Sequence, residues 1–170
     1  MEEQLTFGSQ NHDLDNNDNF APDDSWLAFD TRVDAGAIIS NAVIGKVNLA
    51  DGVVSEIYRE PSPKPWGPGV GAANVNPVDG SVSFIRGLSS AIVDRSYDLC
   101  RRGGACSRLT ESNASIWIDS RDVIPPFTPG ALRGGTHRHE WSNDGQWIGF
   151  TYNDAILAEM EERTGRKLDL

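Results

Sequence analysis

Two histidines separated by one residue are the strongest candidates for chemistry in this sequence. His137 and His139 follow Gly134 and Gly135 in a stretch that reads as a short β-strand. Alternate side chains of a strand share one face, about 7 Å apart along the chain. Imidazoles are common ligands of transition metals, so the pair predicts a site for one divalent transition metal ion. The competing interpretation is structural, with both rings hydrogen-bonded to the backbone between neighbouring sheets.

Two further residues are candidates for ligand binding. Arg133 precedes the two glycines, which allow a close backbone approach, and its guanidinium suits a carboxylate or a phosphate. An ion pair with an interior aspartate is the alternative role for this arginine. His12 is the other candidate, and the chain has three histidines in all. We assign no catalytic residue, because the sequence has no Gly-x-Ser-x-Gly elbow and no cysteine close to a histidine.

The composition indicates a globular chain with an acidic surface. Of its 170 residues 38% are hydrophobic, and the formal net charge is −10. Nucleic acids demand a positive patch, so binding to them is not expected. No apolar run approaches the roughly 20 residues of a spanning helix, which argues against membrane insertion. The start lacks a signal peptide, which predicts a cytoplasmic protein, or a periplasmic one if the true start lies upstream.

The two cysteines of the chain flank a glycine-containing stretch. Cys100 and Cys106 lie on either side of Arg101-Arg-Gly-Gly-Ala105, which reads as a turn that would place them across a hairpin. Without an export signal, free thiols are favoured over a disulfide between them.

A repeat supplies the elements that would position the candidate residues. Three blocks of equal length align without a gap, at 20–29, 75–84 and 141–150. Each begins with an apolar residue, passes through a turn rich in Pro, Asp, Asn and Gly, and ends on a phenylalanine. Such hairpins, with few helix signals between them, predict an all-β fold of four-stranded antiparallel units.

The rest of the chain falls between these hairpins. A helix is expected over 155–163, with Asp154 as its N-cap and Gly165 as its end. The predicted layout is a first unit at 1–59, a Pro/Gly loop at 60–71, a second unit at 72–110, an irregular insertion at 111–131, and an incomplete third unit with the helix at 132–170.

The blocks resemble the Pro-Asp-Gly repeat of TolB-like β-propellers, whose four-stranded blades surround a central channel. Stretches 26–32, 128–137 and 150–154 are similar to the amino-terminal part of a longer bacterial family of unknown function, often labelled TolB-like or "biopolymer transporter Tol". The chain departs from the repeat at Val78 and Asn143, where Asp and Pro are usual. The resemblance implies an all-β, TolB-like β-propeller with only about two and a half four-stranded blades and one short C-terminal helix.

Two functions follow from these resemblances. The first is a binding or scaffold module for a protein partner or a small anionic ligand, the ligand meeting Arg133 and His12. The His-x-His pair also resembles the arrangement in oligogalacturonate lyases, which hold a divalent metal at the channel mouth. This implies, as the alternative, a metal-dependent lyase or hydrolase acting on an anionic, sugar-acid-like substrate.

An open array of blades has a physical consequence of its own. The apolar residues of the second and third blocks are expected to point inward or toward a neighbouring blade, and a last sheet without a neighbour leaves them uncovered. We therefore expect either a truncated product or self-association through the open faces. The residues concerned are Val75, Val82, Phe84, Trp147, Ile148 and Phe150.

Overall fold

The structure is mainly β, with several antiparallel sheets and one short α-helix. A computed structural model describes residues 2–14, 16–33, 37–110, 113–119, 121–122 and 125–167. The elements are β1 (Trp26–Asp30), the 3-10 helix η1 (Ala37–Ile39), β2 (Val43–Asn48), β3 (Val54–Arg59), β4 (Val70–Val75), β5 (Val82–Gly87), β6 (Arg102–Ser107), β7 (Ile116–Trp117), β8 (Gly135–Trp141), β9 (Ile148–Asn153) and α1 (Ala155–Thr164).

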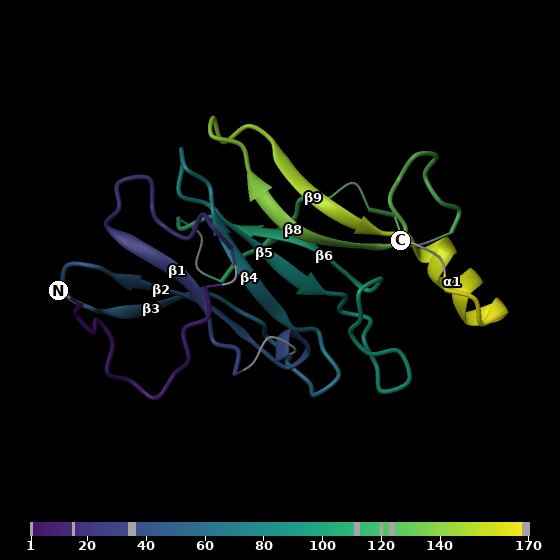
Figure 1. The fold of residues 1–170 in the computed structure, drawn as a ribbon, viewed down its shortest axis with the longest axis horizontal. Helices are drawn as coiled ribbons and strands as arrows, with labels where there is room; N and C mark the ends of the chain where they lie inside the picture. The colour runs from purple at the N-terminus through teal and green to yellow at the C-terminus, as the bar shows by residue number, and fades with distance from the viewer. Residues whose placement is uncertain are drawn as a thin grey trace.

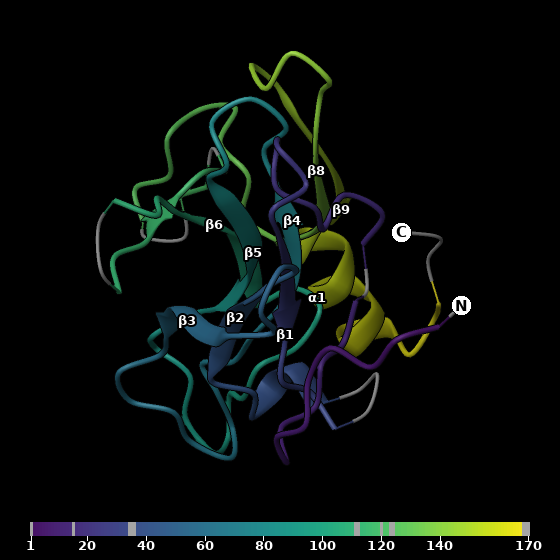
Figure 2. The same ribbon diagram turned by 90° about the vertical axis from the view of Figure 1, so that its left-hand side faces the viewer.

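The strands form three sheets that follow the chain. The first has the order β1-β2-β3, the second β4-β5-β6-β7 and the third β8-β9, and every pairing of neighbours is antiparallel. The sheets succeed one another across the molecule in Figure 1, with α1 at one edge, and Figure 2 gives the perpendicular view. Strand β4 contacts β1 and β2 on one side and β8 on the other. Among the described residues no sheet closes on itself.

The first sheet corrects the expectation of four full strands in each unit. Among the described residues before β1, Asp13 and Phe20 form isolated bridges to it, Asp13 with Asp30 and Phe20 with Leu27. The side-chain amide of Asn19 donates both to the Ala28 carbonyl and to the Ala73 carbonyl of β4, each at 3.2 Å. Residues 16–20 therefore occupy the place that β4 has in the second sheet without forming a continuous strand.

The three repeat blocks fold into the same hairpin. A backbone N–H before each turn donates to a carbonyl five residues later, from Ala21 to Trp26, Asn76 to Ser81 and Ser142 to Trp147, at 2.8 to 2.9 Å. In each turn an aspartate carboxylate accepts the N–H two residues on, and the next residue has a positive φ. The acceptors are Asp23, Asp79 and Asp144.

The departure of the second block from the repeat has a local explanation. The accepting carboxylate lies one position later there, at Asp79, and the positive φ falls on Gly80. The Val78 side chain therefore takes no part in the hydrogen bonds of the turn. Its backbone N–H donates to Asn76 Oδ1 at 2.9 Å. All three turns therefore have the same aspartate hydrogen bond followed by a residue of positive φ. In the second block both features lie one residue later.

Strand β6 corrects the prediction of a turn between the two cysteines. We expected a turn at 101–105 with the cysteines across a hairpin, but one strand runs straight through Gly103 and Gly104. A Cβ on Gly104 would lie 2.6 Å from the ring of His139, so this glycine serves close packing and not a turn. Cys100 and Cys106 carry free thiols, as favoured, and burial raises the pKa of Cys106. The fourth strand of the second sheet is instead β7, within the segment predicted to be irregular.

The core lies between the first and second sheets. Phe84, Val75 and Val82 are fully buried there, as expected, beside Ile44 and Tyr58. Burying a large apolar side chain stabilises by about 1.5 to 3 kcal/mol, so this cluster contributes strongly to the free energy of folding.

Two aromatic side chains of the third repeat block are exposed. Trp147 is 74% exposed and Phe150 is 39% exposed, although Phe29 and Phe84, which end the other two blocks, are buried. Helix α1 begins after the N-cap Asp154 and ends at the left-handed Gly165, as predicted, and buries none of its residues. No helix of the described residues is long and apolar enough to cross a membrane.

Candidate functional site

A β-bulge separates the environments of the two histidines on β8. The pairing of β8 with β9 shifts between His137 and Glu140, and Arg138 has a positive φ of 55°. The strict alternation on which the shared face of His137 and His139 depended is interrupted at this point. His137 is partly exposed, with Nδ1 3.4 Å from the hydroxyl of Thr151, whereas His139 is only 2% exposed.

His139 belongs to a buried polar network that joins the second and third sheets. Its Nε2 lies 2.9 Å from Thr136 Oγ1, and the Thr136 hydroxyl donates to Asp119 Oδ2 at 2.7 Å. The backbone N–H of Gly104 in β6 donates to the same carboxylate oxygen at 3.1 Å. The side chain of Asp119 is fully buried, and Arg121 Nε approaches its Oδ2 at 3.6 Å.

The hydrogen-bond chain fixes the tautomer of His139. The Thr136 hydroxyl has one proton, which it gives to Asp119, so His139 Nε2 must be the donor toward Thr136. His139 Nδ1 is then a bare acceptor, buried and without a hydrogen-bond partner among the described residues. Burial lowers the pKa of His139 to about 4, with the Asp119 carboxylate opposing the shift. The ring is therefore neutral at physiological pH.

Metal binding by His137 and His139 stays a prediction. Among the described residues no three His, Cys, Asp or Glu side chains gather as a metal ion would require. Elemental analysis of purified protein beside the His137→Ala, His139→Ala double variant tests the prediction. About one equivalent of a transition metal, lost in the variant, is the result that metal binding requires.

The two predicted ligand residues lie apart from this network. The Arg133 guanidinium is exposed and sits 4.5 Å from the ring centre of Phe127, a cation–π distance. The His12 ring packs 4.2 Å from that of Phe29, and its Nε2 is buried without a hydrogen-bond partner among the described residues. Neither residue lines the pocket that opens at the end of the first sheet.

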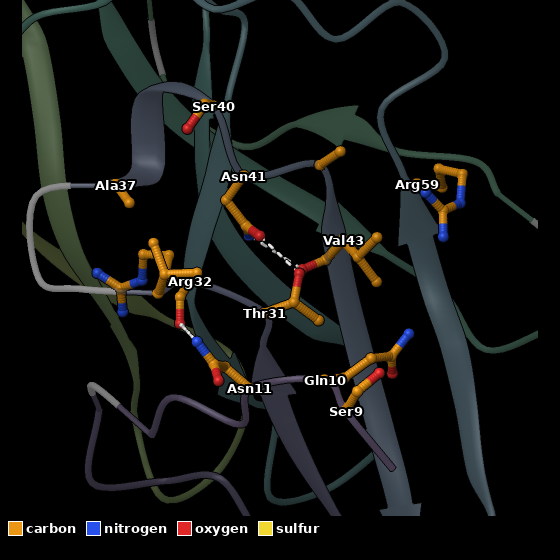
Figure 3. A pocket seen from close by; sticks show the side chains of 12 residues that line it. Ser9, Gln10, Asn11, Thr31, Arg32, Ala37, Ser40, Asn41, Val43 and Arg59 are labelled. Carbon is orange, nitrogen blue, oxygen red and sulfur yellow. Dashed lines mark hydrogen bonds between the residues drawn. The ribbon is translucent and has the colours of Figure 1, made fainter.

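That pocket has a volume of about 470 Å³ and a mixed polar lining. Figure 3 shows Ser9, Gln10 and Asn11 on one side, the segment after β1 beside them, and Arg59 from the end of β3 across the opening. The Asn11 amide donates to the Arg32 carbonyl at 3.1 Å, which ties the N-terminal segment to the segment after β1.

The lining is held in place by contacts that cross between sheets. Asn41 accepts the Thr31 hydroxyl at 2.6 Å and donates to the carbonyl of Val70 in β4 at 2.7 Å. Arg32 Nε donates to both carboxylate oxygens of Asp30, at 2.8 and 2.9 Å. Burial raises the pKa of Asp30, and the Arg32 guanidinium opposes that shift. Hydrogen bonds to two sheets therefore hold this lining, and the charge of Arg32 is paired with a carboxylate.

Sequence reasoning missed most of these residues. Asp119 and Thr136 contribute to one network from positions that no local motif connects, and Asn41 acts through a contact between sheets. The one available signal was the glycine pair beside the cysteines, which we interpreted as a turn. It marks the place where the His139 ring and the Asp119 carboxylate approach the backbone.

The fold and these sites define a mainly β protein built of successive antiparallel sheets that pack through shared polar contacts. A model of the family described as "Protein of unknown function (DUF3748)" matches residues 69–170, and the chain belongs to that family. It is also similar to the uncharacterised protein YidR of Escherichia coli (strain K12), with 36% identity over 158 residues. That alignment covers 93% of this chain and 36% of YidR, so the chain spans about a third of the length of this curated relative.

Proposed function

We propose that this chain is a segment of a TolB-like β-propeller and acts as a binding or scaffold module. The observation that carries the proposal is that a buried asparagine just before a repeat block hydrogen-bonds to the next unit in both of the first two units, as a donor in one and as an acceptor in the other. Asn19 and Asn74 both directly precede a repeat block, and both are buried. Asn19 donates to the Ala73 carbonyl of the next unit, and Asn74 Oδ1 accepts the Trp141 N–H of the unit after it at 3.2 Å.

This recurrence supports units that follow one another around a common axis, as the blades of a propeller do. Further hydrogen bonds join the second and third units, each from a side chain of the second unit to a backbone carbonyl of the third. The Asn76 amide donates to the Gly145 carbonyl at 3.1 Å, and the Ser83 hydroxyl to the His139 carbonyl at 3.5 Å. When repeat units are stacked through such contacts, the last unit offers a further unit the same kind of surface that the earlier units offer.

The β8–β9 face is where the module would meet its partner. Glu140 takes the position of Asn19 and Asn74 in the third unit and is exposed. Trp147, directly before β9, is 74% exposed, and Phe150 on β9 is 39% exposed. Exposed aromatic side chains of this kind are typical of an interaction site. A further unit of the same repeat, from continuing chain or from a second copy, fits it best.

The pocket of Figure 3 is the place for a small ligand in this proposal. Its hydroxyl and amide groups and the Arg59 guanidinium suit a polar ligand, including the small anion expected from the sequence. Arg59 itself is exposed and paired with Glu56, so an anion would compete with that carboxylate. Such competition predicts weak, salt-dependent binding.

Partner capture with matched variants tests the proposal. Immobilised wild-type protein, Phe150→Asp and Phe7→Asp are incubated with envelope and soluble extracts, and captured proteins are quantified by mass spectrometry. Phe7 is 83% exposed and lies outside the sheets, so Phe7→Asp is the matched control. We expect recovery of a partner by wild type and Phe7→Asp, and about tenfold less by Phe150→Asp. Equal recovery by all three, or turnover of a sugar acid by the purified protein alone, would refute the binding role.

A further inference from the structure

A second pocket lies on the second sheet, separate from that of Figure 3. Its volume is about 340 Å³. Residues 88–90, directly after β5, line one side, and Trp117 at the end of β7 lines another with Asp119, Arg121 and Asp122. None of these residues lines the first pocket. Leu88 and the 40% exposed Trp117 supply an apolar wall, and Ser89 and Ser90 supply hydroxyls.

The pocket contains buried polar atoms that the described residues leave without hydrogen bonds. Asp119 Oδ1 has no hydrogen bond although its side chain is fully buried, and Arg121 Nη1 has none although that side chain is only 7% exposed. Arg121 Nε has only the 3.6 Å ion-pair contact with Asp119 Oδ2. Leaving a buried polar group unsatisfied costs about 1 to 3 kcal/mol. Native proteins rarely retain such groups without a purpose, and both side chains line the pocket.

The surrounding structure holds both groups in position. Asp119 Oδ2 is occupied by Gly104 and Thr136, so Oδ1 is the carboxylate oxygen without a hydrogen bond. Arg121 Nη2 donates to the Arg102 carbonyl of β6 and Nε lies 3.6 Å from Asp119 Oδ2, which leaves Nη1. Gly103 makes this arrangement possible, because a Cβ there would lie 2.5 Å from Asp119 Oδ2.

The chemistry of these atoms selects the ligand. Asp119 Oδ1 requires a donor, and the adjacent Arg121 requires an acceptor. A carboxylate or phosphate only accepts and would face the Asp119 charge, whereas an ammonium group only donates. Neighbouring hydroxyl groups do both. A sugar ring carries such hydroxyls on its edge and apolar C–H groups on its face, which suits the Trp117 wall.

We propose that this pocket binds a neutral sugar ring, with two ring hydroxyls on Asp119 and Arg121 and the ring face against Trp117. Arg86 and Arg121 lie 5.5 and 6.0 Å from the Trp117 ring centre and steady the indole. The inference adds a ligand site to the binding role proposed above and is independent of the β8–β9 face. Its failure would leave the scaffold proposal standing.

Saturation-transfer NMR and titration calorimetry with D-glucose, D-galactose and D-mannose test the site on the full chain. A single small ring typically reaches a Kd of about 1 mM. We expect one of the three sugars to bind at this level. Trp117→Ala and Arg121→Gln should weaken binding about tenfold or more, and Trp117→Phe should restore most of it. Phe7→Ala removes an exposed aromatic side chain outside the pocket and should change nothing.

Two further probes separate the alternatives. D-galacturonate should bind more weakly than D-galactose, because its carboxylate would meet Asp119, and equal or tighter binding would overturn the neutral-ring assignment. N-methylacetamide presents an amide donor and acceptor, and its binding in place of every sugar would assign the pocket to an amide. Absence of binding by all three sugars, or an equal loss in Phe7→Ala, would overturn the proposal. Circular dichroism of each variant establishes that the fold is retained.

Discussion

The buried imidazole of His139 makes the stability of this protein depend on pH in a defined direction. Its pKa falls from 6.5 to about 4 in the folded chain, because burial disfavours the charged ring. The unfolded chain takes up this proton below about pH 6.5, whereas the folded chain does so only near pH 4, so acid favours unfolding. The stabilisation is complete above the unfolded pKa. It diminishes by about 2 kcal/mol between about pH 7 and pH 5 and by about 3 kcal/mol at about pH 4.

Urea unfolding at two pH values measures this contribution. The wild type, His139→Gln and the control His137→Gln are compared at about pH 7 and about pH 5, where most carboxylates stay ionised. Glutamine cannot titrate, so His139→Gln should lose about 2 kcal/mol less than the other two proteins over this interval. If His139→Gln loses as much stability as the wild type, the buried neutral imidazole is not the origin of the acid sensitivity, and the reasoning fails.

Three further predictions concern packing. Gly104→Ala places a Cβ 2.6 Å from the His139 ring and should lower the free energy of unfolding by about 1 to 3 kcal/mol, while Gly8→Ala, with open space around it, should be neutral in the same urea assay. Phe84→Ala should cost about 3 to 5 kcal/mol and Phe150→Ala about 1 kcal/mol or less, because only the first ring is buried; similar costs would mean that β9 is covered in solution. Trp147→Lys should reduce self-association in sedimentation velocity runs over a concentration series, and an unchanged, concentration-dependent profile would exclude this face as the contact.

Local sequence was sufficient for the elements whose geometry is set within a few residues. The three hairpin turns follow from an aspartate that accepts the N–H two residues on and from a residue that tolerates positive φ. Helix α1 follows from the Asp154 cap and the left-handed Gly165. Burial of Phe84 followed from its place in the repeat. These features depend on short-range hydrogen bonds and on side-chain alternation, which the order of residues alone specifies.

Tertiary structure decided everything that depends on partners distant in the chain. A bulge at Arg138 places His137 and His139 in different environments. No local sequence pattern predicts such a bulge. The Gly103 and Gly104 pair lies in a strand because a carboxylate and an imidazole from later segments approach it there. A glycine has the same sequence signature whether it frees the backbone for a turn or makes room for a side chain. Only the packed fold shows which of the two it does.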